Sequence, residues 1–283
     1  NFQISVFGLF INVYLFWRYL KRNTKERFLT YCLAKTVPNA IVCSTFLFWV
    51  TPISALPITY EELPRTINML IGQVSGFGAY VAGALIELAM ASNRCALIFN
   101  PSHNFQYTNY VVLFVFLVSV VYTLLGAIPP DCGFVFDPET YLWTPEETEC
   151  AIAMEHVLFF TILGICVTSI TLNLVIFLKM CYKMVNGISD SEVERRKKQR
   201  SRFFLQSCIQ NCLHVIDMIN FNLIAQLNDA LWFKFIFTTM SLLTIHAADG
   251  LVMYMFHHEK KSIKKLKVRN ILTRNDEHSR VNS

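Results

Sequence analysis

Long runs of apolar residues alternate with short polar segments along the whole chain. Each run is long enough to cross a hydrocarbon core of about 30 Å as a helix rising ~1.5 Å per residue, although the first run only just reaches this length. Alternating stretches of about 10 residues, typical of membrane strands, are missing. The pattern predicts an all-α polytopic membrane protein, a seven-transmembrane helix bundle with helices at approximately residues 2–17, 28–50, 67–91, 107–128, 154–180, 203–227 and 231–256.

The composition agrees with this pattern. Of the 283 residues, 54% are hydrophobic and only 16% are charged, and the mean hydropathy is +0.41. A soluble domain carries about 25% charged residues. The net charge of +5 arises from loops between apolar runs, so we expect a lipid bilayer and no nucleic acid as its partner. The first run begins directly after Asn1, which suggests that the natural N-terminus is missing.

Loop charges predict the orientation. Nearly all of the 25 Lys and Arg residues fall in alternate loops and in the C-terminal tail, whereas acidic residues gather in the other loops. Since basic loops stay in the cytoplasm, we expect the N-terminus outside and the C-terminus cytoplasmic. The basic third cytoplasmic loop serves either topology alone or the docking of a partner. Residues 257–283 are expected to form a basic cytoplasmic tail that starts as a short amphipathic helix on the inner leaflet.

The longest outer loop, residues 129–155, contains two cysteines, Cys132 and Cys150. Cysteines that face an oxidising compartment tend to pair, so we expect a disulfide between them. Closing a loop of this length stabilises the fold by about 3 kcal/mol in the chain-entropy description.

Ionisable residues inside spans are costly, and each is therefore a functional candidate. Depths counted at ~1.5 Å per residue place Lys35, Glu87 and Asp249 at about 12, 9 and 10 Å above the cytoplasmic helix ends. Charges at one depth predict a paired network, either as structural glue or as a switch. The full set proposed for the intramembrane polar network is Asn12, Lys35, Glu87, His246 and Asp249.

Two His-x-x-Asp pairs raise the possibility of a metal site, because His and Asp are zinc ligands. They are His214 with Asp217 and His246 with Asp249. In antiparallel helices Asp217 and Asp249 lie at about 21 and 10 Å above the cytoplasmic side, too far apart for one tetrahedral ion. A site with both histidines and one carboxylate stays open, and with it a seven-helix intramembrane metal-dependent hydrolase. A transporter or channel that uses the buried charges is a further alternative.

Several short motifs occur in a characteristic order. The first span holds Gly8-Leu-Phe-Ile-Asn12, the third ends with Asn93-Arg94, Trp143 lies between the loop cysteines, and the seventh ends with His246-Ala-Ala-Asp249-Gly250. Together they resemble the nematode serpentine chemoreceptors of class X, in the rhodopsin-like superfamily of G-protein-coupled receptors. The chain departs from the superfamily pattern in lacking a cysteine between Arg65 and Ser75, in having Asn93 beside Arg94 where an acid is usual, and in having Gly250 where proline is usual.

The resemblance implies a chemosensory receptor of the plasma membrane of sensory neurons, with a small-molecule ligand, a heterotrimeric G protein as partner, no catalytic residues and no cofactor. Asn93 and Arg94 are then the expected residues for G-protein coupling and switching. The ligand is expected in the outer half of the bundle, with candidate contacts at Asn68, Gln73, Asp217, Asn220, Phe221, Trp232 and His246.

Overall fold

The computed structural model describes residues 1–21, 27–99, 107–129, 132–185 and 191–257. The expected amphipathic tail beyond His257 and part of the third cytoplasmic loop, residues 186–190, lie outside these residues.

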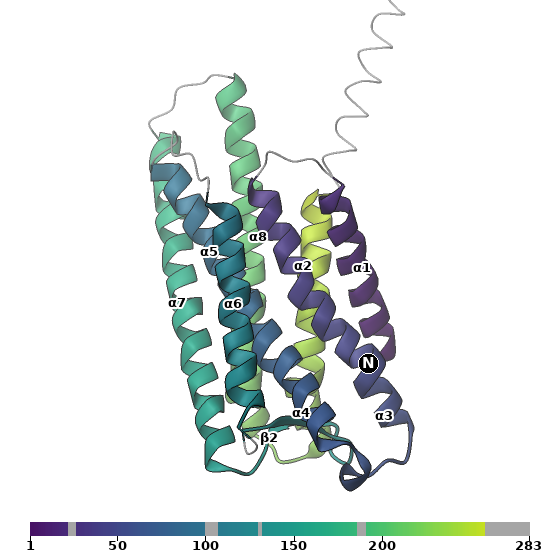
Figure 1. The fold of residues 1–283 in the computed structure, drawn as a ribbon. Coiled ribbons are helices and arrows are strands. Elements are labelled where there is room, and N and C mark those ends of the chain that lie inside the picture. Colours follow the sequence, from purple (N-terminus) through teal and green to yellow (C-terminus); the bar gives the residue numbers. More distant parts are fainter. Residues whose placement is uncertain (22–26, 100–106, 130–131, 186–190, 258–283) are drawn as a thin grey trace, which may run out of the picture.

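The described chain folds into seven helical rods that lie side by side (Figure 1). Some rods are continuous, and others change helix type along their length. Short 3₁₀ turns, η2 (Tyr60–Glu62) and η4 (Ile224–Gln226), lie between rods. The rods are α1 (Phe2–Leu20); α2 (Arg27–Thr45) with η1 (Phe46–Val50) and α3 (Thr51–Ala55); α4 (Arg65–Gly72) with η3 (Gln73–Ala79) and α5 (Tyr80–Phe99); α6 (Thr108–Ala127); α7 (Glu149–Val185); α8 (Ser191–Asn222); and α9 (Leu231–Phe235) with η5 (Ile236–Met240) and residues 241–257.

We call the last rod, Leu231–His257, the C-terminal helix. It is one of five described helices that are long and apolar enough to cross a membrane by length and composition. The α4–η3–α5 rod is the centre of the bundle, since 72% of its most apolar stretch is buried, against 17% for α6. On α6, large apolar side chains such as Phe114 and Leu117 point outward. The predicted all-α membrane fold is confirmed.

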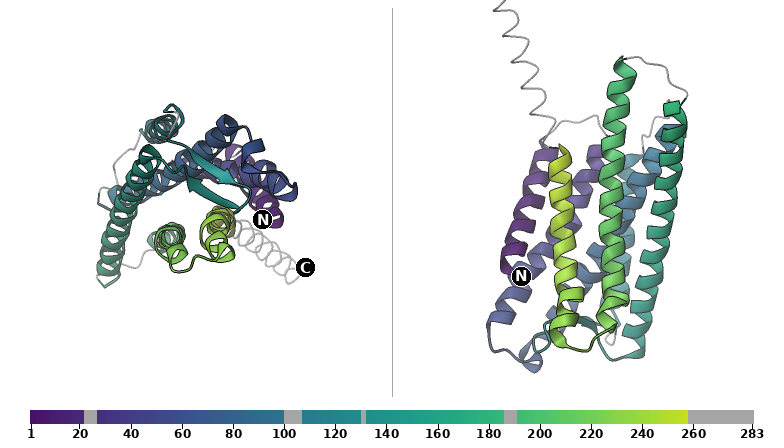
Figure 2. Two further views of the ribbon diagram at one scale, coloured as in Figure 1. Left: turned by 90° about the horizontal axis from the view of Figure 1, so that it is seen from below. Right: turned by 180° about the vertical axis from the view of Figure 1, so that it is seen from behind.

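A small β-hairpin covers one end of the bundle (Figure 2), and we call this the hairpin end. It consists of β1 (Phe134–Asp137) and β2 (Leu142–Pro145), paired antiparallel, and the sequence analysis did not predict it. The Asp137 carboxylate accepts hydrogen bonds from the backbone of Glu139 and the hydroxyl of Thr140, which stabilises the turn. The first residues of α1 lie on the hairpin half of the bundle, and the C-terminal helix ends at the opposite end (Figure 1).

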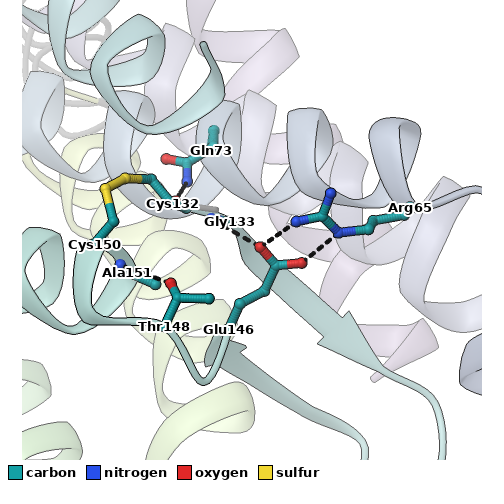
Figure 3. The surroundings of a disulfide bond; sticks show 8 residues. All are labelled: Arg65, Gln73, Cys132, Gly133, Glu146, Thr148, Cys150 and Ala151. Atoms are coloured by element: carbon teal, nitrogen blue, oxygen red, sulfur yellow. Dashed lines mark hydrogen bonds and ion pairs between the residues drawn. A yellow bond between two sulfur atoms is a disulfide. The ribbon is translucent and has the colours of Figure 1, made fainter. Parts of the chain in front are cut away.

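The predicted disulfide between Cys132 and Cys150 is confirmed. It joins the start of the hairpin to the first turn of α7, with the two Cα atoms 4.9 Å apart (Figure 3). Just before this turn, the hydroxyl of Thr148 accepts a hydrogen bond from the backbone N–H of Ala151, as helix-capping residues do. The loop is therefore fixed at the point where it enters α7.

Polar contacts tie the hairpin to the third rod, where the chain lacks a cysteine. The guanidinium of Arg65 makes two hydrogen bonds, of 2.7 and 2.8 Å, to the carboxylate of Glu146 (Figure 3). The same carboxylate accepts from the backbone N–H of Gly133, and the amide of Gln73 donates to the carbonyl of Cys132. These bonds hold the loop against the third rod in place of a covalent link.

The side chain of Asn68 makes two further buried contacts to the hairpin. Its amide donates to the carbonyl of Phe136 at 2.8 Å, and its oxygen accepts from the N–H of the same residue at 3.2 Å. Asn68 thus pairs with the outer edge of β1 as a neighbouring strand would. Both residues are buried, with 1% and 0% exposure, so water cannot replace either bond.

We predict that Asn68→Ala destabilises the protein by about 1–3 kcal/mol, because it leaves a buried N–H and C=O of Phe136 without partners. The measurement is the free energy of unfolding in mixed micelles. Thr66→Ala, at an exposed position two residues before Asn68, is the matched control and should change the free energy of unfolding little. Equal stability of the two variants would contradict the role assigned to Asn68.

Candidate functional site

A cavity of about 80 Å³ lies beneath the hairpin. Its walls come from the hairpin, η3, the start of α5, α7, the end of α8 and the C-terminal helix. A water needs roughly 10–15 Å³ of such space, so the cavity has room for a small molecule rather than a large one. Six aromatic side chains line it: Phe77, Tyr80, Phe134, Trp143, Phe159 and Phe221.

Two segments of π-helix shape this cavity. Gly76 and Phe77 belong to η3, and Thr238 and Thr239 belong to η5. A π-turn inserts an extra residue into the helix and so changes the direction of the side chains around it; such turns occur frequently at functional sites. Thr239 also donates to the carbonyl of Tyr141, which ties the C-terminal helix to the hairpin.

Two carboxylates line the cavity, Asp217 from α8 and Glu155 from α7. Asp217 is buried, and its carboxylate accepts a hydrogen bond of 2.7 Å from the hydroxyl of Ser241. The hydroxyl of Tyr80 lies next to the same carboxylate. Glu155 is half-buried at the α7 wall.

Tyr80 lines the cavity on the side that faces the interior of the bundle, and we call it the floor of the cavity. Its ring packs edge-on against His214 and His246, with ring centroids 5.7 and 6.3 Å away. The two imidazole rings also pack edge-on against each other, with their centroids 6.1 Å apart. The aromatic floor therefore links the cavity to the buried polar groups below it.

Lys35 is the centre of these polar groups, and its side chain is fully buried. Its ammonium contacts Glu87 at 2.6 Å, the carbonyl of Gly83 at 2.9 Å and Asp249 at 3.7 Å. The Nε2 atom of His214 lies 2.9 Å from the ammonium and 3.2 Å from Glu87. Four rods meet at this one cation, contributed by α2, α5, α8 and the C-terminal helix.

Amide side chains extend the network around Asp249. One oxygen of its carboxylate accepts from Asn39 and the other from Gln210, both at 2.7 Å. The amide oxygen of Asn39 pairs with Nδ1 of His246 at 2.8 Å, and its nitrogen donates to Asn12 of α1. Every carboxylate oxygen of Asp249 thus has a donor, as a buried charge requires.

Small residues make room for this network. A side chain at Gly250 would collide with the amide of Asn12, and one at Gly8 would collide with Cys43 and Ala247. Gly250, which replaces the usual proline, therefore allows α1 to approach the C-terminal helix closely. Pro38 removes one backbone hydrogen bond from α2 close to Lys35 and Asn39.

Arg94 lies near the opposite end of the bundle. Its guanidinium donates to the backbone carbonyl of Phe203 in α8 at 2.7 Å and lies 5.4 Å from the ring centroid of Phe28. Arg94 and the neighbouring Asn93 are both buried. Within the described residues, the Nε of Arg94 and the side-chain oxygen of Asn93 have no hydrogen-bond partner.

The two histidines considered as metal ligands, His214 and His246, contact other protein side chains. The Nε2 atom of His214 faces Lys35 and Glu87, while Nδ1 of His246 faces Asn39. In the part of the chain that the structure describes, no three His, Cys, Asp or Glu side chains form a group suited to a metal ion.

The expected ligand contacts separate into two groups. Asp217 and Phe221 line the cavity. Asn68 and Gln73 hold the hairpin instead, Asn220 donates to Ser241, and Trp232 is 64% exposed on the outside. His246 lies below the floor formed by Tyr80.

The sequence analysis missed other residues of the site. They are Tyr80 and Glu155 in the cavity, and Asn39 and Gln210 in the network. Trp143, which the sequence analysis used only as part of the loop motif, also lines the cavity. The spacing of Asn39 four residues after Lys35, on the same helical face, is a signal that could have revealed it.

We predict that Lys35→Met destabilises the protein by about 3–5 kcal/mol, because two buried carboxylates lose their cation. The double variant Lys35→Met with Glu87→Gln should recover much of this loss. Lys234→Met is the matched control, since Lys234 pairs with the 99% exposed Asp229, and should change the free energy of unfolding little. A single variant as stable as its control would refute the central role of Lys35.

The arrangement of seven rods, a disulfide-linked hairpin and buried polar groups agrees with a comparison to protein families. No curated protein matches the chain. A family model described as "Serpentine type 7TM GPCR chemoreceptor Srx" matches residues 2–257, which is nearly the whole chain. The protein is therefore a member of the Srx family of serpentine seven-transmembrane chemoreceptors.

Proposed function

We propose that this protein is a chemosensory receptor that binds a small molecule in the cavity and activates a heterotrimeric G protein at the opposite end. The hairpin end then faces outside, and the end near Arg94 faces the cytoplasm, as loop charges predict. The plasma membrane of sensory neurons is the expected location.

The observation that supports this function best is the arrangement of contacts along α8. Asp217 lines the cavity, His214 and Gln210 join the polar network, and the carbonyl of Phe203 accepts from Arg94. These positions recur at intervals of seven, four and three residues, which places them on one helical face. One rigid helix therefore contacts the cavity, the network and Arg94.

This arrangement gives a ligand a physical route to the other end. A ligand shifts a conformational equilibrium only by binding one state more tightly than the other. A ligand in the cavity contacts both α7 and α8, so its affinity for the protein differs between two states in which α8 has different positions relative to α7. Movement of α8 also alters the contacts of His214 and of the Phe203 carbonyl, so the site near Arg94 senses it.

The first test is co-expression with a panel of heterotrimeric G proteins, with nucleotide exchange as the measurement. We expect constitutive or ligand-evoked exchange with at least one of them. A receptor that reaches the surface and drives exchange with none would overturn the proposed coupling.

We predict that Arg94→Ala reduces ligand-evoked exchange to the basal level, because the side chain that joins α5 to α8 at the proposed G-protein end is lost. Arg18→Ala is the matched control, since Arg18, in the last turn of α1, also donates to a backbone carbonyl, that of His257 at the end of the C-terminal helix. The control should keep its evoked exchange. Evoked exchange that survives in Arg94→Ala would remove this residue from the coupling site.

A further inference from the structure

The electrostatics of the cavity indicate which class of molecule it binds. Asp217 and Glu155 both line it, and no described Lys, Arg or His side chain does. Among the described residues, no ion pair involves either carboxylate. The cavity is therefore acidic, and the described residues of its wall include no cation to balance that charge.

Asp217 shows this imbalance most clearly. It is 4% exposed, its carboxylate accepts a hydrogen bond from the neutral hydroxyl of Ser241, and the neutral Tyr80 lies beside it. The nearby His214, three residues earlier on α8, directs its Nε2 atom at Lys35 and Glu87 instead. The other buried carboxylates nearby have a cationic partner, since Glu87 and Asp249 both form ion pairs with the ammonium of Lys35. A buried charged carboxylate without a cationic partner is costly. For Asp217, a molecule in the cavity would supply that cation.

The aromatic wall fits the same chemistry. Tyr80, Phe221, Phe159 and the stacked pair Phe134 and Trp143 surround the space beside the carboxylates. Faces of aromatic rings attract cations, by about 2 kcal/mol or more where water is excluded, and they also accept the methyl groups of an alkylated amine. An anionic ligand would meet two carboxylates and the negative faces of the rings.

From these observations we propose that the ligand is a small organic cation, an alkylated amine or quaternary ammonium, whose charge is held by Asp217 with Glu155 and whose alkyl groups contact the aromatic wall. This inference rests on the proposed function, since it names the ligand class of the same cavity. The indole N–H of Trp143, which has no partner among the described residues, offers a hydrogen bond to an oxygen of such a ligand.

The test uses the full chain in lipid nanodiscs and three probes of similar size. Choline carries a positive charge, 3,3-dimethyl-1-butanol is its neutral isostere, and butyrate carries a negative charge. The measurement is the saturable shift of the unfolding temperature with probe concentration. We expect choline to bind about tenfold or more tightly than the neutral isostere, and butyrate to give no saturable shift.

Variants then assign the selectivity to the carboxylates. Asp217→Asn, which keeps the size of the side chain and an acceptor for Ser241, should remove the preference for choline over the isostere. Glu155→Gln should reduce it. Glu139→Gln is the matched control on the exposed turn of the hairpin and should leave it unchanged. Because the readout is a ratio of two affinities in one variant, a general loss of stability does not imitate the result.

The inference is overturned if the neutral isostere binds as tightly as choline, if Asp217→Asn keeps the full preference, or if no cation gives a saturable shift. Nucleotide exchange separates this outcome from failure of the proposed function. Exchange driven by the isostere but not by choline would remove the ligand class and keep the receptor. Choline binding without exchange on any G protein would keep the ligand class and remove the coupling.

Discussion

The ammonium of Lys35 is the constraint on which the bundle depends. A buried cation must have acceptors, and here they come from Gly83, Glu87 and Asp249, while Nε2 of His214 lies 2.9 Å from the ammonium; these contacts come from three other helices. Inside a membrane the hydrophobic effect does not select one helix face over another, because lipid tails are as apolar as the packed side chains. Polar contacts of this kind therefore decide the register in which α2, α5, α8 and the C-terminal helix pack.

Polar contacts also fix the position of the hairpin, at the hairpin end of the bundle. It packs on the third rod through Arg65, Asn68 and Gln73, where the superfamily pattern would have a cysteine. Three hydrogen-bonding side chains in a row can release and re-form in steps, unlike a covalent bond. The cavity lies between these polar contacts and the network around Lys35, and its lining includes Trp143 from the hairpin and Tyr80 from α5.

Much of this arrangement could be predicted from the sequence. Apolar runs revealed the helices, and counting depth along them brought Lys35, Glu87 and Asp249 to one level, where the structure also brings them together. The hairpin was missed because its strands have only four residues each. The place of Tyr80 and Trp143 in one cavity was missed because aromatic residues are common in spans and loops, and only the fold shows which of them lie together.

The departure at Asn93 has a physical consequence for the resting state. Without an acidic neighbour, Arg94 donates to the neutral carbonyl of Phe203, and such a bond is weaker than one between two charged groups. The end near Arg94 therefore contributes less to holding α8 in place than an ion pair would. The charged contacts that hold α8 lie higher, where His214 faces Lys35 and Glu87, directly beneath the cavity floor. At the end near Arg94, guanidinium groups hold α8 through neutral backbone carbonyls, Arg94 to Phe203 and Arg202 to Phe256. The contact of α8 with a buried ion pair, through His214, lies beneath the cavity where the proposed ligand binds.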